Sequence, residues 1–155
     1  MTKTLYGDRI GKQGKIRLGC SAVIFDNSRG AVLLTRRADN GQWCLPSGGV
    51  DPGESVAETC EREVWEETGL KVQLERLVGV YSNPNSLVEY ADGNRVQVIA
   101  LNFEAVVIGG EIGLSDETTD IRYFPLVDIE NMPLTLDHKQ RILDTLNGKA
   151  AAFIR

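Results

Sequence analysis

The chain is poor in the residues that build zinc sites and disulfide frameworks. Its 155 residues include one histidine and three widely spaced cysteines, Cys20, Cys44 and Cys60, with no Cys-x-x-Cys pair among them. An odd number of separated cysteines without a neighbouring histidine argues against both kinds of site. We therefore expect three reduced cysteines, with Cys60 acting as a core residue.

Long apolar runs and excess positive charge are also missing. The sequence contains no stretch of about 18 apolar residues, which is the length needed to span a membrane. Residues 1–19 also lack the apolar segment of a signal peptide. With 17 Lys and Arg against 22 Asp and Glu, the net charge of -5 disfavours a broad nucleic-acid surface. We expect one cytoplasmic domain over residues 1–155, without a membrane segment, that acts on a small molecule.

What the chain has instead is a segment dense in glutamate, residues 48–70, which reads GGVDPGESVAETCEREVWEETGL. Ser55 and Glu58 form a Ser-x-x-Glu capping box, which predicts a helix start at Ser55. Gly69 can adopt the left-handed conformation that ends a helix, and Pro52-Gly53 marks a turn before it. The segment therefore predicts a helix over about 55–68.

Glutamates of this helix fall beside its apolar stripe. At about 100° per residue, the stripe expected to face the core contains four apolar residues, Val56, Ala57, Cys60 and Val64. Glu63 and Glu67 fall on the same stripe, and Glu66 lies at its edge. A glutamate-rich helix is usually a solvated face, but carboxylates crowded beside an apolar stripe repel one another and lose hydration. A bound cation removes both costs.

The chemistry of these side chains indicates which cation. Oxygen ligands without nearby histidine or cysteine favour Mg²⁺, with Mn²⁺ as a substitute, over zinc. The glycines Gly48 and Gly49 let the backbone come close to a metal or phosphate, and the Ser47 backbone carbonyl could add a neutral ligand. Because Mg²⁺ completes its shell with waters and substrate phosphate oxygens, the implied substrate is a phosphate compound.

The spacing of the segment carries a family resemblance. Its defined positions are Gly48-x5-Glu54-x7-Arg62-Glu63-Val64-x-Glu66-Glu67-x-Gly69-Leu70. This pattern resembles the signature of the Nudix hydrolases at every defined position. The resemblance implies that Glu63, Glu66 and Glu67 bind metal, and that Glu54 and Arg62 form an ion pair that orients these ligands. It also implies attack of water on a phosphorus of a diphosphate linkage.

The general base has two candidates. In the family it can be a glutamate of the signature, here Glu67, or one on a downstream loop, here Glu117 in the acidic segment 115–120. Glu117 is also a possible metal ligand. An acidic loop beside a strand is most often only a solvated turn, so the assignment of Glu117 depends on the resemblance. The sequence leaves the choice open.

The organic part of the substrate is only weakly indicated. Arg36 could bind a phosphate, and Trp43 and Tyr81 could stack on a base. Each has an ordinary alternative, because arginines and loop tyrosines are usually surface residues and Trp43 can be a core residue. We expect His138 on a helix surface, without a role. The oligomeric state, monomer or homodimer, stays open.

The rest of the chain indicates a mixed α and β fold. Strands are predicted over 16–25, 31–34, 71–81, 95–108 and 121–126, the first two joined into a hairpin by a turn at 26–30. Thr135 or Asp137 could cap a C-terminal helix over about 136–147, with apolar positions Ile142, Leu143 and Leu146. Pattern alone supports one sheet with helices, and the resemblance adds an α/β/α sandwich with a mixed central sheet.

Two functions remain open at this point. The first is a pyrophosphohydrolase acting on a nucleoside triphosphate or on a nucleoside diphosphate linked to another group, such as ADP-ribose or a nucleotide sugar. The second is a non-catalytic nucleotide-binding or regulatory module of the same fold. Such modules tend to lose signature carboxylates or gain a DNA-binding extension, and this chain shows neither. An isomerase is disfavoured because no Cys and Glu pair is recognisable as its acid and base.

Overall fold

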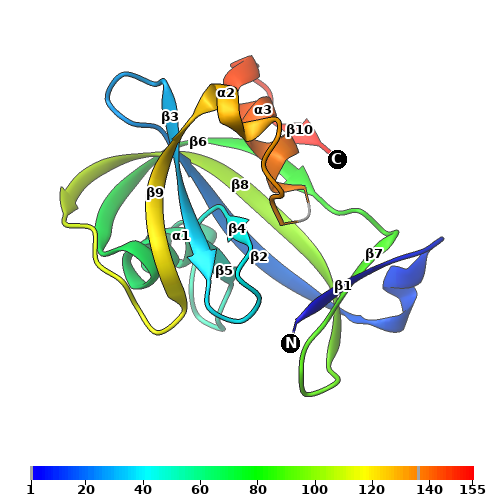
Figure 1. The fold of residues 1–155 in the computed structure, drawn as a ribbon. Helices are drawn as coiled ribbons and strands as arrows, with labels where there is room; N and C mark the ends of the chain where they lie inside the picture. Colours follow the sequence, from blue (N-terminus) through cyan, green and yellow to red (C-terminus); the bar gives the residue numbers. More distant parts are fainter. Residues whose placement is uncertain (1, 136) are drawn as a thin grey trace.

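The computed structural model describes residues 2–135 and 137–155 as strands packed between helices (Figure 1). The strands are β1 (Lys3–Tyr6), β2 (Lys15–Ile24), β3 (Ala31–Arg37), β4 (Trp43–Cys44), β5 (Ser47–Gly49), β6 (Leu70–Tyr81), β7 (Ser86–Glu89), β8 (Arg95–Gly110), β9 (Thr118–Pro125) and β10 (Phe153–Ile154). The helices are α1 (Val56–Thr68), α2 (Leu126–Ile129) and α3 (His138–Asn147), with a 3-10 turn, η1 (Ile10–Gln13). The predicted mixed α and β fold is confirmed.

The strands form two sheets rather than the single sheet that the pattern suggested. The larger, mixed sheet has the order β1-β7-β8-β2-β5, and β6 pairs with β8 and carries β10. Its centre is the parallel pair of β2 and β8, which runs for ten residues of each strand. The smaller sheet is antiparallel, with the order β4-β3-β9. A parallel pair so distant in sequence cannot be read from local turn signals.

The predicted hairpin of β2 and β3 is wrong. Among the described residues, these neighbours share one isolated bridge, Phe25 with Val32, and then enter different sheets. Both strands are continuously buried, from Gly19 to Ile24 and from Val32 to Thr35. A strand buried on both faces lies inside its fold, and here each finds a distant partner, β8 or β9.

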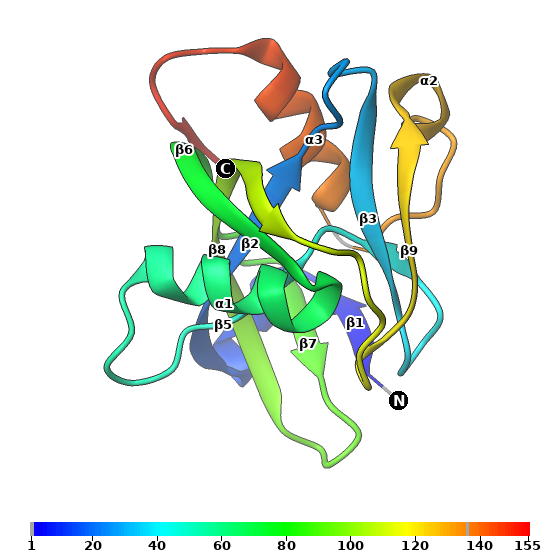
Figure 2. The same ribbon diagram turned by 90° about the vertical axis from the view of Figure 1, so that its left-hand side faces the viewer.

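Alternation along these buried strands divides the core in two. Cys20, Ala22 and Ile24 of β2 pack in a cluster with Cys60 and Val64 of α1. Val23, which points the other way, packs in a second cluster with Ile142 of α3. Figures 1 and 2 show α1 and α3 on opposite sides of β2 and β8. The two helices therefore cover opposite faces of the central strands.

Helix α1 begins and ends where the sequence predicts. The Ser55 side chain accepts a hydrogen bond from the Glu58 backbone, and the Glu58 carboxylate accepts one from the Ser55 backbone, so the capping box is complete. Gly69 ends the helix with φ of 76°. Of the four predicted core positions, Cys60 and Val64 are buried and Val56 is partly buried, whereas Ala57 is exposed.

Helix α3 matches its prediction less closely. It begins at His138 with Asp137 at the N-cap position, and it ends at Gly148. The predicted start at residue 136 lies outside the described residues. Ile142 is fully buried, but Leu143 and Leu146 are exposed by 49% and 44%. The buried face of α3 contains His138, Arg141, Asp144 and Thr145 instead, so it is polar where the pattern suggested leucine.

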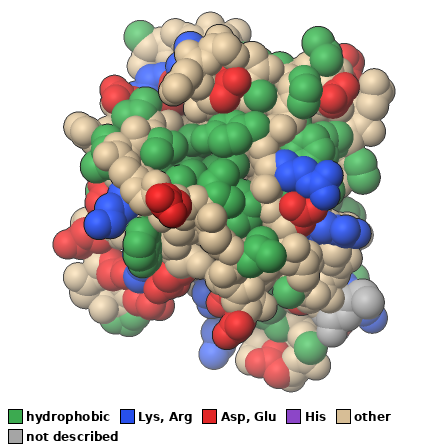
Figure 3. Space-filling model, turned by 60° about the vertical axis from the view of Figure 1, so that its left-hand side comes forward, with side chains coloured by type: hydrophobic (Ala, Val, Ile, Leu, Met, Phe, Trp, Pro, Cys, Tyr) green, Lys and Arg blue, Asp and Glu red, His purple; other side chains and the backbone are tan. Residues whose placement is uncertain are grey.

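The molecular surface carries mixed charge. On the face in Figure 3, hydrophobic side chains gather in the middle, and the Lys and Arg side chains are scattered among acidic ones. No basic stripe of the kind that follows a nucleic-acid backbone crosses this face. In the described part of the chain, no helix is both long and apolar enough to cross a membrane.

Candidate active site

The glycine turn and the acidic helix meet at one point of the larger sheet. Strand β5 pairs with β2 in an antiparallel register that places Gly48 opposite Cys20. A Cβ atom added at Gly48 would overlap the carboxylate of Glu63 on α1. Gly48 is therefore needed for close approach of backbone and carboxylate rather than for a special φ angle.

Two of the three predicted metal ligands are buried on the inner face of α1. Glu63 and Glu67 are exposed by only 9% and 7%, while Glu66 beside them is exposed. Burial raises the pKa of Glu63, and it raises the pKa of Glu67 to about 8. One backbone donor opposes this shift, because the Ser47 N–H donates to Glu67 Oε2 at 3.3 Å. Desolvation of the charged form is the dominant effect at both carboxylates.

Arg62 connects the carboxylates to the turn. It donates from Nε and Nη2 to the two Glu54 carboxylate oxygens, at 2.6 and 3.0 Å. Its Nη1 donates to Glu63 at 2.8 Å and to Glu66 at 3.1 Å, and Nη2 also donates to the Gly49 carbonyl. The guanidinium fork thus sets the positions of two predicted ligands at once.

Glu54 anchors this arginine. Besides the bidentate pair with Arg62, which forms as the resemblance implied, its Oε2 accepts from the Thr59 hydroxyl at 2.8 Å and from the Asp51 N–H at 3.1 Å. The Arg62 guanidinium, followed by the Thr59 hydroxyl, lowers the pKa of Glu54 to about 2. Glu54 therefore stays ionised and holds Arg62, which is the supporting position predicted for it.

A cavity of about 840 Å³ opens in front of these groups. Its volume falls in the range of small-molecule sites. Its wall includes three groups of residues that the sequence singled out, namely the turn Ser47, Gly48 and Gly49, the helix residues Arg62, Glu63, Glu66 and Glu67, and the loop residue Glu117. All predicted catalytic and metal positions except Glu54 therefore line one cavity, and Glu54 reaches it through Arg62.

Glu117 directly precedes β9, on a loop that meets the end of α1. It is exposed, and its backbone carbonyl accepts from the Ala38 N–H at 3.0 Å. The next residue, Thr118, donates through its hydroxyl to the Glu67 carbonyl at 3.0 Å, which ties this loop to the end of α1. The negative charge of Glu117 adds to the rise in pKa of Glu63 and Glu67. Its role as base or ligand stays a prediction.

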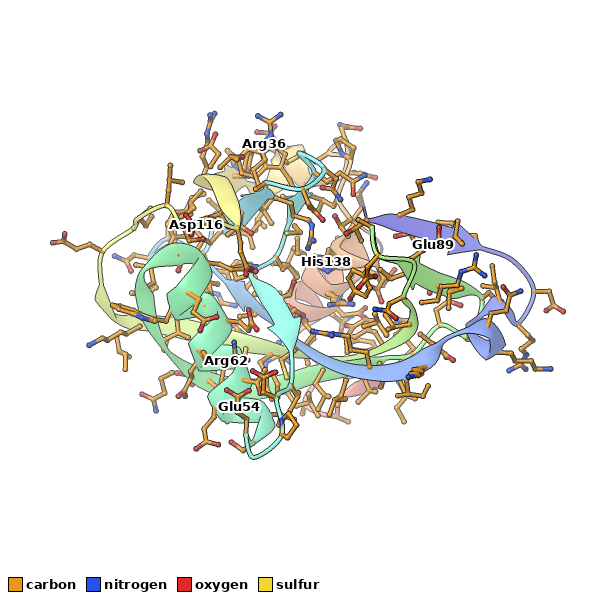
Figure 4. All side chains as sticks on the ribbon, turned by 90° about the horizontal axis from the view of Figure 1, so that it is seen from below. Arg36, Glu54, Arg62, Glu89, Asp116 and His138 are labelled. Atoms are coloured by element: carbon orange, nitrogen blue, oxygen red, sulfur yellow. The ribbon has the colours of Figure 1, made fainter. Side chains whose placement is uncertain are left out.

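Three residues suggested for substrate binding lie elsewhere. Arg36 is exposed and donates to the Gly41 carbonyl, and Figure 4 shows it at the opposite border of the molecule from Arg62 and Glu54. Trp43 packs edge-on against Phe124 at 4.7 Å, as part of the second core cluster. Tyr81 is buried and faces a smaller neighbouring cavity of about 220 Å³. None of the three lines the larger cavity.

Other cavity residues were missed by sequence reasoning. Arg17 reaches over Gly49, where a Cβ atom would overlap its guanidinium, and it forms no ion pair with the described residues. Arg37 lies deeper and pairs with Asp39 at 2.9 Å. An isolated arginine on a strand gives no signal by itself. The pairing of β2 with β5, which brings Arg17 to the site, is not visible in the sequence.

The expectation for His138 is wrong. Its side chain is exposed by only 5% and lines the cavity from the start of α3. The pattern of α3 gave apolar positions only at Ile142, Leu143 and Leu146, and it did not mark His138 as an inner residue. In the structure the first residue of α3 is buried, where it accepts from the Leu45 N–H.

The described residues contain no group of three His, Cys, Asp or Glu side chains already gathered as a metal cage. Arg62 holds both Glu63 and Glu66, and the Ser47 N–H holds Glu67. The donor set still fits Mg²⁺, because this ion takes few protein carboxylates and keeps several waters. The Gly48 backbone approaches the Glu63 carboxylate more closely than a residue with a side chain could, and this places Glu63 where a metal ligand is expected.

Comparisons with known proteins agree with this site. The family profile described as NUDIX domain matches residues 15–145. An ADP-ribose pyrophosphatase of Methanocaldococcus jannaschii is 38% identical over 122 residues, covering 76% of this chain and 67% of that protein. A nucleoside triphosphatase NudI of Escherichia fergusonii is 33% identical over 115 residues, covering 69% and 82%. An ADP-ribose pyrophosphatase structure from Streptococcus suis has a TM-score of 0.69 at 27% identity and covers 90% of this chain and 97% of that one.

The matched residues include the glycine turn, the acidic helix, the Glu117 loop and the start of α3. The relatives' names, ADP-ribose pyrophosphatase and nucleoside triphosphatase, are those of hydrolases. The chain belongs to the NUDIX domain family. The sequence prediction of the family, and that of a hydrolase, are confirmed.

Proposed function

We propose that the protein is a Mg²⁺-dependent pyrophosphohydrolase that cleaves the diphosphate linkage of a nucleoside triphosphate or of a nucleoside diphosphate linked to another group. One observation carries the proposal. Glu63 and Glu67 are buried side by side on a cavity wall, and burial raises the pKa of both. Buried carboxylates with so few protein donors favour a cation as their partner.

The cation would be held by Glu63, Glu66 and Glu67, with the Ser47 backbone carbonyl as a neutral ligand. Bound Mg²⁺ neutralises charge on the phosphate oxygens and lowers the pKa of the attacking water. Arg62 orients Glu63 and Glu66 through its two Nη1 hydrogen bonds, and Glu54 keeps Arg62 in place. These supports leave the carboxylates little freedom to turn away from the cavity.

The chemical step is a displacement at phosphorus. The water oxygen forms a bond to one phosphorus while the bond from that phosphorus to the bridging oxygen breaks, and the bridging oxygen leaves on the second phosphate. Glu67 or Glu117 accepts the proton that the water loses. Both carboxylates line the cavity. Lys3, Arg17, Arg37 and Arg141 are the cations outside α1 that line this cavity, and of these Arg17 and Arg37 are our candidates for contacting phosphate oxygens.

The substrate class is supported by the size of the cavity and by the relatives. A volume of about 840 Å³ accommodates a whole nucleotide rather than a bare diphosphate. The relatives named above carry the names ADP-ribose pyrophosphatase and nucleoside triphosphatase. Both kinds of compound contain the linkage that this site suits.

The direct test is turnover of a panel of nucleoside triphosphates, nucleotide sugars, ADP-ribose and dinucleoside polyphosphates with Mg²⁺ or Mn²⁺. Products are resolved by anion-exchange chromatography. We expect cleavage of at least one class, abolished by a chelator and restored by Mg²⁺. Binding of panel members without any cleavage would favour the alternative, a non-catalytic nucleotide-binding module.

The choice of base is tested by replacing Glu117. If Glu117 accepts the proton, Glu117→Ala lowers kcat by about a hundredfold or more, the scale of general base catalysis. Glu117→Gln serves as the isosteric control and shows the same loss, because an amide cannot accept the proton. Unchanged kcat and unchanged metal dependence in both variants would leave Glu67 as the base and Glu117 as a surface residue.

A further inference from the structure

We propose that His138 and Asn40 form a donor wall in the cavity that selects nucleotides whose base presents acceptor atoms, as 6-oxopurines do, over those with an amino group at that edge. This inference rests on the proposed function and names the base that the site prefers. Neither residue belongs to the acidic helix or to its supports.

The tautomer of His138 is fixed by a backbone group. The Leu45 N–H donates to His138 Nδ1 at 3.0 Å. Because a backbone N–H can only donate, Nδ1 carries no proton and the proton of the neutral ring is on Nε2. Burial lowers the pKa of His138 well below 6.5, so the ring stays neutral at physiological pH. His138 is thus an uncharged donor through Nε2 and no acceptor.

The donor atom of His138 is not used by the described part of the protein. Nε2 has no hydrogen-bond partner among residues 2–135 and 137–155. The sealed polar side-chain atoms without a hydrogen bond there are Asp137 Oδ1, which lies 2.7 Å from Arg141 Nη2, and Arg141 Nε. Nε2 is not among these sealed atoms, and His138 lines the cavity. Figure 4 shows His138 in the interior at the start of α3, between the side of Arg62 and the side of Glu89.

The orientation of the Asn40 amide is also fixed by a backbone N–H. The Gln42 backbone N–H donates to Asn40 Oδ1 at 3.0 Å. Since that donor fixes Oδ1 as the oxygen, the other atom of the amide is the NH₂ group, which has no partner in the described part of the chain. Asn40 also lines the cavity. Two residues with an unused uncharged donor, each oriented by a backbone N–H, therefore line the same cavity.

Thr135 joins these two residues into one wall. Its hydroxyl donates to Gln42 Oε1 at 3.1 Å, and its carbonyl accepts from the His138 N–H at 3.1 Å. Its own N–H donates to the Trp43 carbonyl at 3.1 Å. The loop that carries Asn40 and the start of α3 that carries His138 are thereby held against each other. These bonds restrain the two segments that carry the donors, as a recognition site requires.

The wall lies one short segment away from the carboxylates. Leu45 is bonded to His138, and Ser47, two residues later, is bonded to Glu67. Two residues of extended chain span about 7 Å. A nucleotide whose phosphates lie at Glu67 therefore carries its nucleoside toward the wall. The apolar residues Val88, Val98 and Ala100 line the same cavity and suit a planar ring.

Base chemistry determines which nucleotide such a wall accepts. A 6-oxopurine presents two adjacent acceptors, O6 and N7, on one edge, whereas adenine presents a donor amino group in place of O6. Two donors match the first edge, and one of them is left facing a donor on the second. A buried donor left unpaired lowers binding by about tenfold to a hundredfold.

The first test compares ITP with ATP, which share ribose and triphosphate. We expect kcat/KM of the intact protein to favour ITP by at least about tenfold. His138→Asn keeps an oxygen acceptor near the Leu45 N–H but shortens the side chain away from the cavity, so it lowers the ITP to ATP ratio at least about fivefold. Equal losses for both nucleotides, or a wild-type ratio within about twofold, would overturn the proposal.

The second test needs no turnover and no variant. His138 is the chain's one histidine, so its imidazole nitrogen signals in NMR are assigned without mutation. We expect a protonated Nε2 and an unprotonated Nδ1, and an Nε2–H signal that shifts on addition of IMP but not of AMP. A proton on Nδ1, or equal shifts with both ligands, refutes the donor wall. Turnover without a preference for either base would refute the donor wall but leave the proposed function standing. An Nε2–H shift with IMP alone, in a protein without turnover, would support the donor wall but not the proposed function.

Discussion

Two carboxylates, one on α1 and one on α3, are buried to a similar depth, but their surroundings shift their pKa in opposite directions. Asp144 on α3 is exposed by 3% and Glu67 on α1 by 7%. Burial acts to raise the pKa of Asp144, but hydrogen bonds from Arg155, Gln140 and Tyr81 hold it below its ordinary value. Glu67 has one backbone donor, and its pKa is raised to about 8.

The difference lies in how many donors the protein itself supplies. Asp144 accepts from Tyr81 Oη and Gln140 at 2.8 Å, and from Arg155 at 2.8 and 3.1 Å. These bonds tie the end of the chain to α3 and leave Asp144 no capacity for a ligand. Glu67 keeps its capacity. A buried charge saturated by the protein is structural, and one left short of partners is reserved for something that binds.

Removing the charge at Glu67 tests this difference between the two carboxylates most directly. We expect Glu67→Gln to lower turnover at least about a hundredfold, the scale of a lost ligand or base. The same variant should melt a few °C higher than the wild type without metal, because it no longer buries an ionisable carboxylate. Kinetics at saturating Mg²⁺ and melting with and without Mg²⁺ measure both. Near-wild-type turnover would contradict a role of Glu67 as metal ligand or base.

The matched change on the other side is Asp144→Asn. It should destabilise the fold by about 2 kcal/mol, because the charge-assisted bonds from Arg155 are lost. Melting temperature should fall by about 4–8 °C. Turnover below the melting range should stay within about twofold of wild type, since Asp144 does not line the larger cavity. A stable Asp144→Asn protein would show that the partner count does not separate the two sites.

The smallest effect concerns the pH dependence of stability. His138 has a pKa well below 6.5 because of burial, so below pH 6.5 the unfolded chain binds a proton that the folded chain does not. Stability due to the neutral ring is present above pH 6.5 and falls by about 1.4 kcal/mol per pH unit below it.

Urea unfolding of the wild type and of His138→Asn between pH 5 and 7.5 measures this term as a difference. The subtraction removes the contribution of Glu67, which is the same in both proteins. Because the pKa of Glu67 is raised on folding, that contribution to stability is lost as the pH rises from the pKa of the unfolded chain toward about 8. Parallel profiles for the two proteins would show that the folded state also protonates His138.

The α1 side of the molecule could be predicted because its determinants are local. The capping box of Ser55 and Glu58, the stop at Gly69 and the placement of Glu63 and Glu67 on one stripe all lie within 15 residues. Each depends on helix geometry alone. The burial of Glu63 and Glu67 on one face therefore followed from spacing, whereas their predicted role as metal ligands and the Arg62 to Glu54 pair came from the resemblance.

The α3 side could not be predicted because its contacts join distant segments. Tyr81 meets Asp144 across 63 residues, and Leu45 meets His138 across 93. The parallel pairing of β2 with β8 has the same character. No turn signal or period marks such pairs, so a buried histidine looked like a surface residue and Tyr81 looked like a substrate contact.

The segment from Leu45 to Ser47 spans the distance between the two helices, with one amide bonded to a side chain from each. The Leu45 N–H donates to His138 of α3, and the Ser47 N–H donates to Glu67 of α1. Amide hydrogen exchange at these two positions therefore reports separately on the two sides of the cavity. A cation that draws Glu67 away exposes the Ser47 amide to exchange, while a base held at the donor wall slows exchange at Leu45. Two neighbouring signals thus record the order in which metal and nucleotide arrive.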